Sequence, residues 1–471
     1  MLRKIVIIGS IIFLGAIGTG SFWLWQNYQN GRLPEKIITA AFPAIKNSAT
    51  GINVFQSALG MGVPRTYLVL LLNNTELRPG GGFIGSYAIV RFDKGKSEVL
   101  KVEGTEILDN NYIGFVATPP PPLAKYLGLK NWQFRDSNWS PDFPTDAKKA
   151  LEFYRAEHGV EAENISGVIA ITPNIFEEIL KLVGPITVDG IKFTSENFTE
   201  TLEYEVEYGF EKRGVKFRDR KQLLGDVWGA LWPRLASSFF TNWSDYKKLI
   251  PALLREKQVM LYSTVADEEA KILEQDWGGE MKSEAGDYLL WVDANLDSLK
   301  TDVAVTRSLS YSITPSSSSF VAKATMRYYH TGGFSWRTSR YRDYARVFVP
   351  AGSRLVGSSG NDGKVDQGEE GGRHWFGAFI SINPGKQGEL SFTYLLPKSI
   401  ADGLEDGQYY LGVQKQLGTD RIRLTLELKF DKKLTGAIPP ESSEKFGDNL
   451  YQVAADLSVD REFEIELTKS Q

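Results

Sequence analysis

The stretch L-V-L-L-L-N-N-T-E-L-R-P-G-G-G-F-I-G-S-Y, residues 68–87, passes from an apolar run into polar residues and three glycines, and then becomes apolar again. The two apolar parts predict buried strands over 67–72 and 83–92. The chain therefore places very polar and very flexible residues directly after its most hydrophobic strand. In α/β proteins, ligands commonly bind just beyond the carboxyl end of such a strand.

The segments around this stretch alternate between strands and helices. Further strands are expected at 97–102 and 165–171, and Thr145 is a candidate N-cap for a helix that continues to Tyr154. Four consecutive prolines at 119–122 argue against a helix or a central strand at that point. The alternation indicates an α/β fold with a central sheet. Further helices are expected at 173–182, 195–208, 219–235 and 244–262.

The pattern changes after residue 297, where helical periodicity fades. Eight short alternating runs, separated by Gly, Pro, Ser and Asp turns, predict an antiparallel β-sandwich. A length of 471 residues is enough for two sizeable cores. We therefore expect an α/β domain at 64–290 and a β-sandwich domain at 298–471.

The N-terminal segment predicts a membrane anchor. Residues 5–25 carry no charge over about the 20 residues that a helix needs to cross a bilayer, and two basic residues precede them. We expect an anchor at 1–30 and a helical stalk at 31–63. A cleavable signal peptide is the alternative, but the aromatic residues at 22–25 favour an uncleaved helix. The charge bias predicts a single-pass plasma-membrane protein with a cytoplasmic N-terminus and an extracytoplasmic body.

The composition excludes several classes of function. A net charge of -4 gives no electrostatic case for a nucleic-acid partner. The chain has no cysteine, which excludes disulfides, thiolate metal sites and cysteine nucleophiles. Its three histidines lack metal-ligand spacing, and no G-x-S-x-G motif supports a serine hydrolase.

The first candidate site follows the first strand. Its polar side chains leave the sheet at the edge where ligands bind, and its glycines allow backbone N–H groups to approach a phosphate closely. The alternative is a glycine-rich turn with exposed polar side chains. The candidate ligand-binding residues are Asn73, Asn74, Glu76, Arg78, Gly81 and Gly82.

The second candidate site is R-D-S-N, residues 135–138, which aromatic residues flank on both sides. In the functional interpretation, Arg135 binds an anion and Asp136 or Asp142 is a metal ligand or a base, with Asn138 as a further polar group. In the structural interpretation, Arg135 and Asp136 form a buried ion pair that holds the loop.

The third candidate site is K-R-G-V-K-F-R-D-R-K, residues 212–221, with six positive residues in ten positions. Such a run is ordinarily a solvated face. Here Arg218, Lys221 and Gln222 are expected to share one helical face near a helix N-terminus, which is a favourable place for a phosphate.

The motifs N-N-T-E-L-R-P-G-G-G-F-I-G-S-Y, R-D-S-N-W-S-P-D-F-P, I-S-G-V-I-A-I-T-P and R-Y-R-D-Y-A-R-V-F-V-P-A-G-S resemble the bacterial family of unknown function numbered four thousand and twelve, over about residues 60–430. That family more distantly resembles the LytR-CpsA-Psr envelope proteins, whose extracytoplasmic α/β domain follows one membrane helix. The distant resemblance implies binding of a polyprenyl pyrophosphate lipid. It also implies arginines and a magnesium-holding aspartate that serve the transfer of a linked glycopolymer to the cell wall.

The matching positions of the distant resemblance are few. Asn138 stands where those proteins carry an asparagine before a helix, and the segment from Arg218 to Gln222 resembles their Arg-x-x-Arg-Gln. Where they have a second Arg-x-Asp after the first strand, this chain has G-G-F at 81–83. A basic group and the expected magnesium carboxylate are therefore missing.

The sequence thus predicts a membrane-anchored envelope protein that binds a polyprenyl (pyro)phosphate-linked glycan and transfers it to the cell wall. Arg135, Asp136 and Arg218 are the expected catalytic residues, Lys221 and Gln222 are further ligand-binding residues, and Asp136 is the expected Mg²⁺ ligand. The alternative is a non-enzymatic envelope or adhesion module. In that interpretation the same clusters are structural ion pairs, and the sandwich binds a partner or a glycan.

Overall fold

The computed structural model describes residues 57–94, 96–111, 114–238, 241–283, 285–316, 319–441 and 447–468. The expected anchor, and the expected stalk up to residue 56, lie outside these ranges. Within them, no helix combines the length and the hydropathy needed to cross a membrane.

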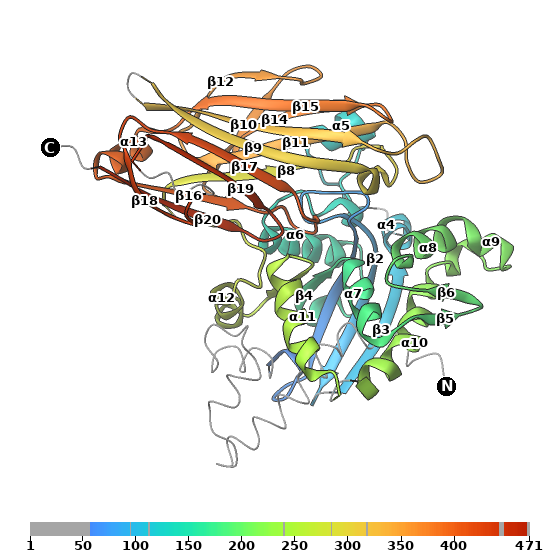
Figure 1. The fold of residues 1–471 in the computed structure, drawn as a ribbon. Coiled ribbons are helices and arrows are strands. Elements are labelled where there is room, and N and C mark those ends of the chain that lie inside the picture. Colours follow the sequence, from blue (N-terminus) through green and yellow to red (C-terminus); the bar gives the residue numbers. More distant parts are fainter. Residues whose placement is uncertain are drawn as a thin grey trace, which may run out of the picture. The chain divides into compact units, whose positions relative to one another are not determined.

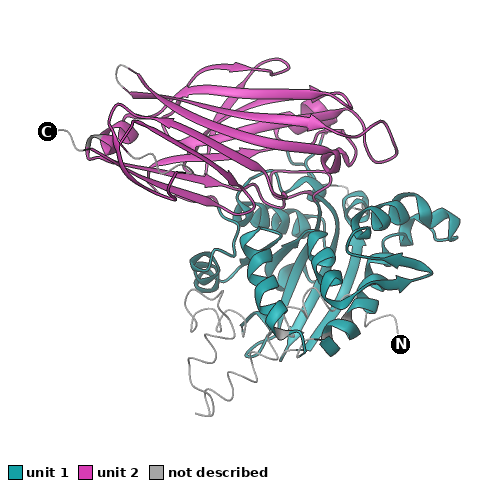
Figure 2. Ribbon diagram, in the orientation of Figure 1, with its two compact units in different colours: residues 1–73, 83–118, 131–280 teal, residues 74–82, 119–130, 281–471 magenta. Residues whose placement is uncertain are grey.

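The chain forms two compact units, coloured separately in Figure 2. Unit 1 contains Met1–Asn73, Phe83–Thr118 and Asn131–Glu280. Unit 2 contains Asn74–Gly82, Pro119–Lys130 and Met281–Gln471. The expected α/β domain was one continuous segment, whereas here two of its loops belong to the β-rich unit.

Unit 1 is built on a five-stranded mixed sheet (Figure 1). β1 runs parallel to β4, and the other neighbouring strands are antiparallel. The order across the sheet is β3 (Lys96–Gly104), β2 (Phe83–Asp93), β1 (Arg65–Asn73), β4 (Ile165–Ile171) and β7 (Val259–Ser263). A separate small hairpin pairs β5 (Ile186–Val188) with β6 (Ile191–Phe193).

Both faces of this sheet are covered, because alternate residues of each strand point to opposite sides. Val90 of β2 belongs to a core that includes Ile179 and Trp228 from two of the helices. On the other face, Tyr87 packs edge-on against Phe134 and Tyr154. The helices of unit 1 are α4 (Thr105–Asn111), α6 (Phe143–Ala156), α7 (Asn174–Val183), α8 (Phe198–Tyr204), α9 (Phe210–Lys212), α10 (Gln222–Ser238), α11 (Trp243–Arg255) and α12 (Ala266–Glu274).

Two local predictions for unit 1 were wrong, and a third was correct in type but not in its bounds. The N-cap of α6 is Asp142, whose carboxylate accepts a hydrogen bond from the Thr145 backbone N–H at 3.1 Å. The segment expected as one helix over 244–262 is α11, which contains Pro251 and ends at Arg255, followed by strand β7; Lys257, with a φ of 56°, takes the chain out of the helical conformation between them. The segment expected as a helix over 195–208 is α8, which continues into a π-helical turn, η4 (Glu205–Gly209).

Unit 2 consists of two β-sheets around one core. The six-stranded sheet has the order β12 (Arg354–Ser359), β15 (Gln387–Leu395), β10 (Ser319–His330), β9 (Val305–Ser316), β17 (Arg423–Lys429) and β19 (Leu450–Asp456). The seven-stranded sheet has the order β13 (Asp366–Glu370), β14 (Arg373–Ile382), β11 (Tyr341–Pro350), β8 (Asp287–Val292), β16 (Gln408–Gln414), β20 (Arg461–Leu467) and β18 (Leu434–Ile438).

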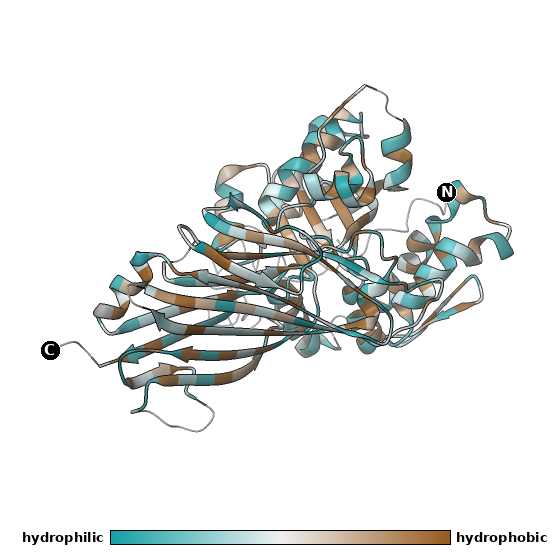
Figure 3. Cartoon of the chain, turned by 90° about the horizontal axis from the view of Figure 1, so that it is seen from above, coloured by the Kyte–Doolittle hydropathy of each residue, from teal (hydrophilic) through white to brown (hydrophobic). Residues whose placement is uncertain are grey.

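The strands of unit 2 follow the expected alternation where one face of a strand meets the core. In β17, R-L-T-L-E-L-K, every second residue is buried, and the same alternation of hydrophobic and hydrophilic residues is visible along the strands in Figure 3. The expected purely antiparallel order is only partly correct, since β17 pairs in parallel with β9 and β16 pairs in parallel with β8.

Two short helices complete unit 2. α5 (Pro121–Leu127) begins inside the run of four prolines, which corrects the expectation that these residues exclude a helix. Proline lacks an N–H that the first helical turn would leave unpaired, so it is well tolerated there. Tyr126 of α5 stacks on Phe379, with ring centroids 4.0 Å apart. The second helix is α13 (Lys398–Glu405).

Candidate functional site

Arg135 lies in a short 3₁₀ turn, η2 (Phe134–Asp136), and forms an ion pair with Asp109 of α4. The Asp109 side chain is fully buried, whereas 27% of the Arg135 side chain is exposed. The partner expected from the sequence was Asp136, the next residue along the chain. The structure therefore confirms a structural ion pair at Arg135 but replaces the expected acid with one 26 residues earlier.

Asp109 also faces a second carboxyl group, that of Glu157. Burial and the neighbouring Asp109 raise the pKa of Glu157 to about 8, and burial raises the pKa of Asp109 against the opposing effect of Arg135. A hydrogen bond between two carboxyl groups requires a proton on one of them. Glu157 also accepts the Phe134 backbone N–H at 3.2 Å, which fixes η2. Burial beside Asp109 therefore makes Glu157 keep its proton more readily than an ordinary glutamic acid.

Lys221 and Arg220 share one carboxylate, that of Glu106. The distances are 2.8 Å from Lys221 Nζ and 3.0 Å from an Arg220 guanidinium nitrogen. Lys221 also donates to the backbone carbonyl of Gly85. Burial raises the pKa of Glu106, but the charge and hydrogen bond of Lys221 outweigh it and lower the pKa overall. Burial lowers the pKa of Lys221.

Glu106 and Asp109 lie three residues apart on α4 and therefore on the same helical face. This short helix thus brings together two clusters that were predicted separately, those of Arg135 and Lys221. We call the group of Glu106, Asp109, Arg135, Arg220 and Lys221 the α4 cluster. Among these five residues, three cations meet two carboxylates.

Arg218 and Gln222 were expected to share one helical face with Lys221, but neither belongs to the α4 cluster. Arg218 is exposed in a 3₁₀ turn, η5 (Phe217–Asp219), and α10 begins only at Gln222. The two residues therefore do not share a helical face. The Gln222 side-chain amide donates to the Asp219 carboxylate at 3.2 Å.

Asp136 and Asn138, the other candidates in this loop, are buried at 5% and 2% exposure. The Trp132 indole N–H donates to the Asp136 backbone carbonyl at 2.7 Å. Within the described ranges, no three His, Asp or Glu side chains are arranged to hold a metal ion. Asp136 as the ligand of the expected Mg²⁺ therefore stays a prediction.

The first predicted cluster lies in unit 2, apart from Asn73, which ends β1 in unit 1. Arg78 is 3% exposed, donates to the Asn295 carbonyl at 2.7 Å, and forms an ion pair with Glu76 at 3.1 Å. The Asn74 side-chain amide donates to the Gly418 carbonyl at 2.9 Å. These side chains hold the segment Asn74–Gly82 within unit 2.

Glycines allow the backbone of the segment Asn74–Gly82 to pack closely against the backbone at Gly418. Gly81 and Gly82 have φ values of 107° and 143°, which other residues rarely adopt. A Cβ added to Gly418 would lie 2.2 Å from the Gly81 carbonyl oxygen. Polar and flexible residues follow the first strand because the chain here leaves one unit and packs its backbone into the other.

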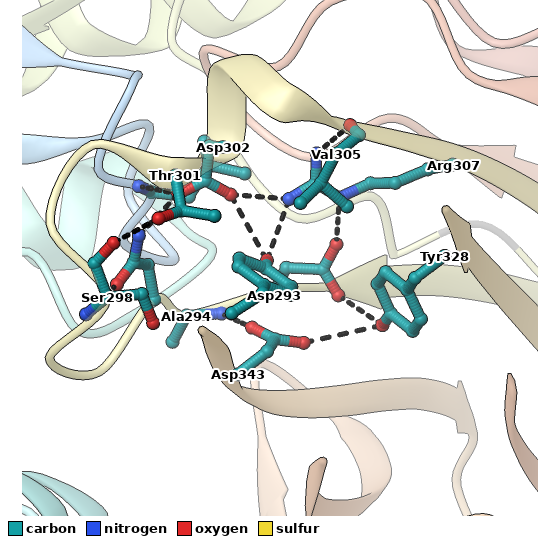
Figure 4. Close-up of polar contacts among 12 residues, drawn as sticks. Asp293, Ala294, Ser298, Thr301, Asp302, Val305, Arg307, Tyr328 and Asp343 are labelled. Atoms are coloured by element: carbon teal, nitrogen blue, oxygen red, sulfur yellow. Dashed lines mark hydrogen bonds and ion pairs between the residues drawn. The ribbon is translucent and has the colours of Figure 1, made fainter. Parts of the chain in front are cut away.

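Leu77, in the middle of the segment Asn74–Gly82, is hydrogen-bonded to a buried polar network of unit 2 (Figure 4). The sequence analysis did not predict this network. The Asp302 carboxylate accepts the Leu77 backbone N–H at 3.0 Å and the Asn295 amide at 2.7 Å. Its other oxygen pairs with the Arg307 guanidinium, which also binds Asp293 at 2.7 Å.

A third carboxyl group, Asp343, completes this group, which we call the Arg307 network. Tyr328 O–H donates to Asp293 at 2.7 Å and lies 3.3 Å from Asp343. Burial and the neighbouring Asp293 raise the pKa of Asp343 well above its usual range. Arg307 cannot neutralise three buried carboxylates, so Asp343 is the one that carries a proton.

Comparison with known proteins supports only part of the sequence interpretation. Residues 63–206 match the family model described as a protein of unknown function (DUF4012). This segment belongs to the DUF4012 family. The match confirms the first resemblance drawn from the motifs, and it includes α4, Arg135 and Arg78 but ends before Lys221. The distant resemblance to the LytR-CpsA-Psr proteins stays a prediction.

Other comparisons add no function. No curated protein matches the chain. A solved structure described as a nutrient-binding protein from Legionella pneumophila is 9% identical, with a TM-score of 0.23, over 38% of this chain and 71% of that one. An M1 zinc metallopeptidase from Deinococcus radiodurans is 11% identical, with a TM-score of 0.17, over 36% of this chain and 43% of that one. The chain thus spans less than half of the metallopeptidase, and neither likeness carries an argument about activity.

Proposed function

We propose that this protein is a membrane-anchored, extracytoplasmic module of the bacterial cell envelope that acts by binding, and that its polar clusters serve the fold. The observation that carries this proposal is that Arg78, Arg135 and Lys221, the buried or half-buried cations expected to bind an anion, each already pair with a carboxylate. The partners are Glu76, Asp109 and Glu106, in that order. A structural role explains these pairs without a ligand.

The electrostatics favour this interpretation over an anion site. A phosphate would have to displace a carboxylate from each cation and leave that carboxylate unpaired in a buried position, which is costly. The raised pKa of Glu157, which is caused chiefly by burial, indicates that water has little access to this part of unit 1. Arg78 is only 3% exposed, so a ligand could not reach its guanidinium group from solvent.

The location in the envelope rests on the sequence alone. The uncharged segment 5–25 after two basic residues supports a single-pass anchor with the body outside the cytoplasm. Unit 2, with two sheets and large exposed strand faces, is the part that we propose to bind a partner or a glycan.

A second candidate function is the binding of a polyprenyl (pyro)phosphate-linked glycan, followed by its transfer to the cell wall in the manner of LytR-CpsA-Psr proteins. One observation favours it: α4 gathers Arg135, Arg220 and Lys221, an excess of one cation over the two carboxylates of the α4 cluster. Arg218, exposed nearby in sequence, would add a further cation. Because no three His, Asp or Glu side chains of the described ranges are arranged to hold a metal ion, we derive no step through Mg²⁺.

Binding of a polyprenyl pyrophosphate separates the two functions. The full chain would be placed in lipid nanodiscs and titrated with and without magnesium, as wild type, Arg135→Ala and Lys221→Ala. Lys149→Ala is the matched control, since its ion pair with Glu152 is exposed. We expect no saturable binding that depends on Arg135 or Lys221. Saturable binding that both variants lose and the control keeps would establish the second candidate function and refute the first.

A further inference from the structure

Unit 2 carries three exposed apolar side chains in the segments at one end of its sheets. Leu299 is 48% exposed, Val303 is 47% exposed and Phe334 is 76% exposed. A phenylalanine exposed to this degree is unfavourable in water unless its surface is used.

The segments that carry these side chains lie against one another. Leu299 pairs with Thr338 in an isolated β-bridge, and the Lys300 backbone N–H donates to the Arg337 carbonyl at 2.9 Å. A Cβ added to Gly332 would lie 2.8 Å from the Ala304 side chain. The loop 331–340, between β10 and β11, is therefore joined to the segment 297–304. We call these two segments, with the turn 383–386, the Phe334 tip.

The turn 383–386 belongs to the tip through two contacts. The His330 backbone N–H donates to the Lys386 carbonyl at 3.0 Å, and Arg340 Nε donates to the Asn383 side-chain oxygen at 2.8 Å. Both Arg340 and Lys386 are exposed. The basic side chains of the turn and of the loop thus lie at the same end of unit 2.

The Phe334 tip carries an excess of positive charge. Its two acidic residues, Asp297 and Asp302, form ion pairs with Arg342 and Arg307, which lie outside the three segments. The basic residues of the tip are Lys300, Arg337, Arg340 and Lys386. With four basic and two acidic residues, the three segments carry a net charge of +2 in a chain with a net charge of -4, and Arg340 and Lys386 are their exposed basic residues.

We propose that the Phe334 tip docks on the surface of a bilayer that contains anionic lipids. Aromatic and aliphatic side chains that enter the boundary between headgroups and acyl chains, surrounded by Lys and Arg that face lipid phosphates, give this kind of reversible attachment. The charge complementarity with an anionic headgroup layer selects a lipid surface over an apolar protein partner. This contact is separate from the N-terminal anchor and from the proposed function of the clusters.

Glycines in the structure provide the positions for a direct test. Gly333, next to Phe334, and Gly357 on β12 both have open space where a Cβ would lie, and neither has a left-handed φ. Because the chain has no cysteine, Gly333→Cys and Gly357→Cys each give one attachment point for a fluorophore. Gly357 pairs with Thr393, six residues along β15 from Gln387, or about 20 Å from the tip end of that strand.

The labelled full chain would be reconstituted in vesicles of phosphatidylcholine alone, or of phosphatidylcholine mixed with phosphatidylglycerol, with a brominated lipid as the quencher. We expect quenching at position 333 to exceed that at 357 severalfold in the phosphatidylglycerol vesicles. It should fall when salt is raised, and also when Phe334→Ser is introduced.

Several outcomes would overturn the proposal. Equal quenching at the two positions would mean that the N-terminal segment alone holds the protein at the membrane. Quenching at 333 without dependence on phosphatidylglycerol would remove the role of the basic residues. A fluorescence change at 333 that depends on protein concentration in the absence of vesicles would assign the tip to a second copy of the chain.

Discussion

The α4 cluster of unit 1 and the Arg307 network of unit 2 have opposite charge balance. In the α4 cluster, Glu106 serves two cations, and the Arg135 side chain remains 27% exposed. In the Arg307 network, one guanidinium with 8% of its side chain exposed serves Asp293 and Asp302, with Asp343 beside them. The first has spare positive charge near the surface, and the second has spare negative charge in the interior.

The α4 cluster and the Arg307 network thus show two different ways in which a protein accommodates charged side chains that lack an equal number of opposite charges. The Arg307 network lowers its excess by protonating Asp343 and by hydrogen bonds from Tyr328. In the α4 cluster only the Arg135 side chain, at 27% exposure, reaches toward water, because the side chains of Arg220 and Lys221 are 8% and 13% exposed. The Arg307 network should therefore contribute more to stability when intact and lose more when broken. The predictions below test this ranking.

The largest effect is expected for Arg307→Ala. Removal of the guanidinium leaves Asp293 and Asp302 buried without their cation, which should cost about 3–5 kcal/mol of unfolding free energy. Urea unfolding of the full chain measures this loss. Arg307→Lys, which keeps the charge but not the two-sided geometry, should lose less. A loss below about 1 kcal/mol for Arg307→Ala would show that the network contributes little.

The next effect concerns the segment that the Arg307 network holds. Gly418→Ala places a Cβ against the Gly81 carbonyl oxygen at a φ of +66°, so we expect a loss of about 1–3 kcal/mol. Gly403→Ala is the matched control, because it lies in α13 with only a distant contact at 3.9 Å, and alanine favours a helix. Equal melting temperatures for the two variants would refute the close packing of Gly81 on Gly418.

In the α4 cluster, Glu106→Gln should destabilise by about 1–2 kcal/mol, because Lys221 and Arg220 lose their shared charge partner while a hydrogen-bond acceptor remains. Glu152→Gln breaks the exposed pair with Lys149 and should change stability by less than about 0.5 kcal/mol. Thermal unfolding of both variants measures the contrast. If Glu106→Gln is as mild as the control, the α4 cluster does not hold unit 1 together.

A separate effect is a pH dependence at Glu157, which lies beside the α4 cluster. Glu157 has a pKa raised from 4.5 to about 8, so the folded protein keeps a proton that the unfolded chain releases between these values. The stability that this group contributes is present below about pH 4.5 and is lost as the pH rises toward 8. Glu157→Gln cannot lose that proton, so its stability relative to wild type should increase with pH in this window. A difference that stays constant from pH 5 to pH 8 would contradict the assignment.

In unit 2, strands that meet the core on one face were predictable, and strands at sheet edges were not. The eight strands expected in unit 2 correspond to β9, β10, β11, β14, β15, β16, β17 and β20. The missed strands β12, β13, β18 and β19 lie at the four sheet edges. β13, D-Q-G-E-E, has no buried residue, so no alternation marks it. β8 was missed for the opposite reason, because all six of its residues are buried.

The site residues were predictable as polar motifs but not as pairs. Arg135 and Lys221 stood out in the sequence, yet their partners Asp109 and Glu106 come from T-E-I-L-D-N-N, a short helix with no distinctive motif. The spacing of the two acids by three residues was the only available signal. Local sequence could not show which acid Arg135 would meet, since the pairing depends on how α4 packs beside η2.

The central claim is that the cations of the α4 cluster stabilise the fold, and a double-mutant cycle on Arg135 and Asp109 tests it most directly. The unfolding free energy of the full chain would be measured at pH 7 for Arg135→Ala, Asp109→Asn and the double variant. We predict that both single variants lose stability and that the coupling between them is at least about 1 kcal/mol. Residues kept for a ligand are often neutral or unfavourable for stability. Single variants that match or exceed the wild type, with no coupling, would contradict the account.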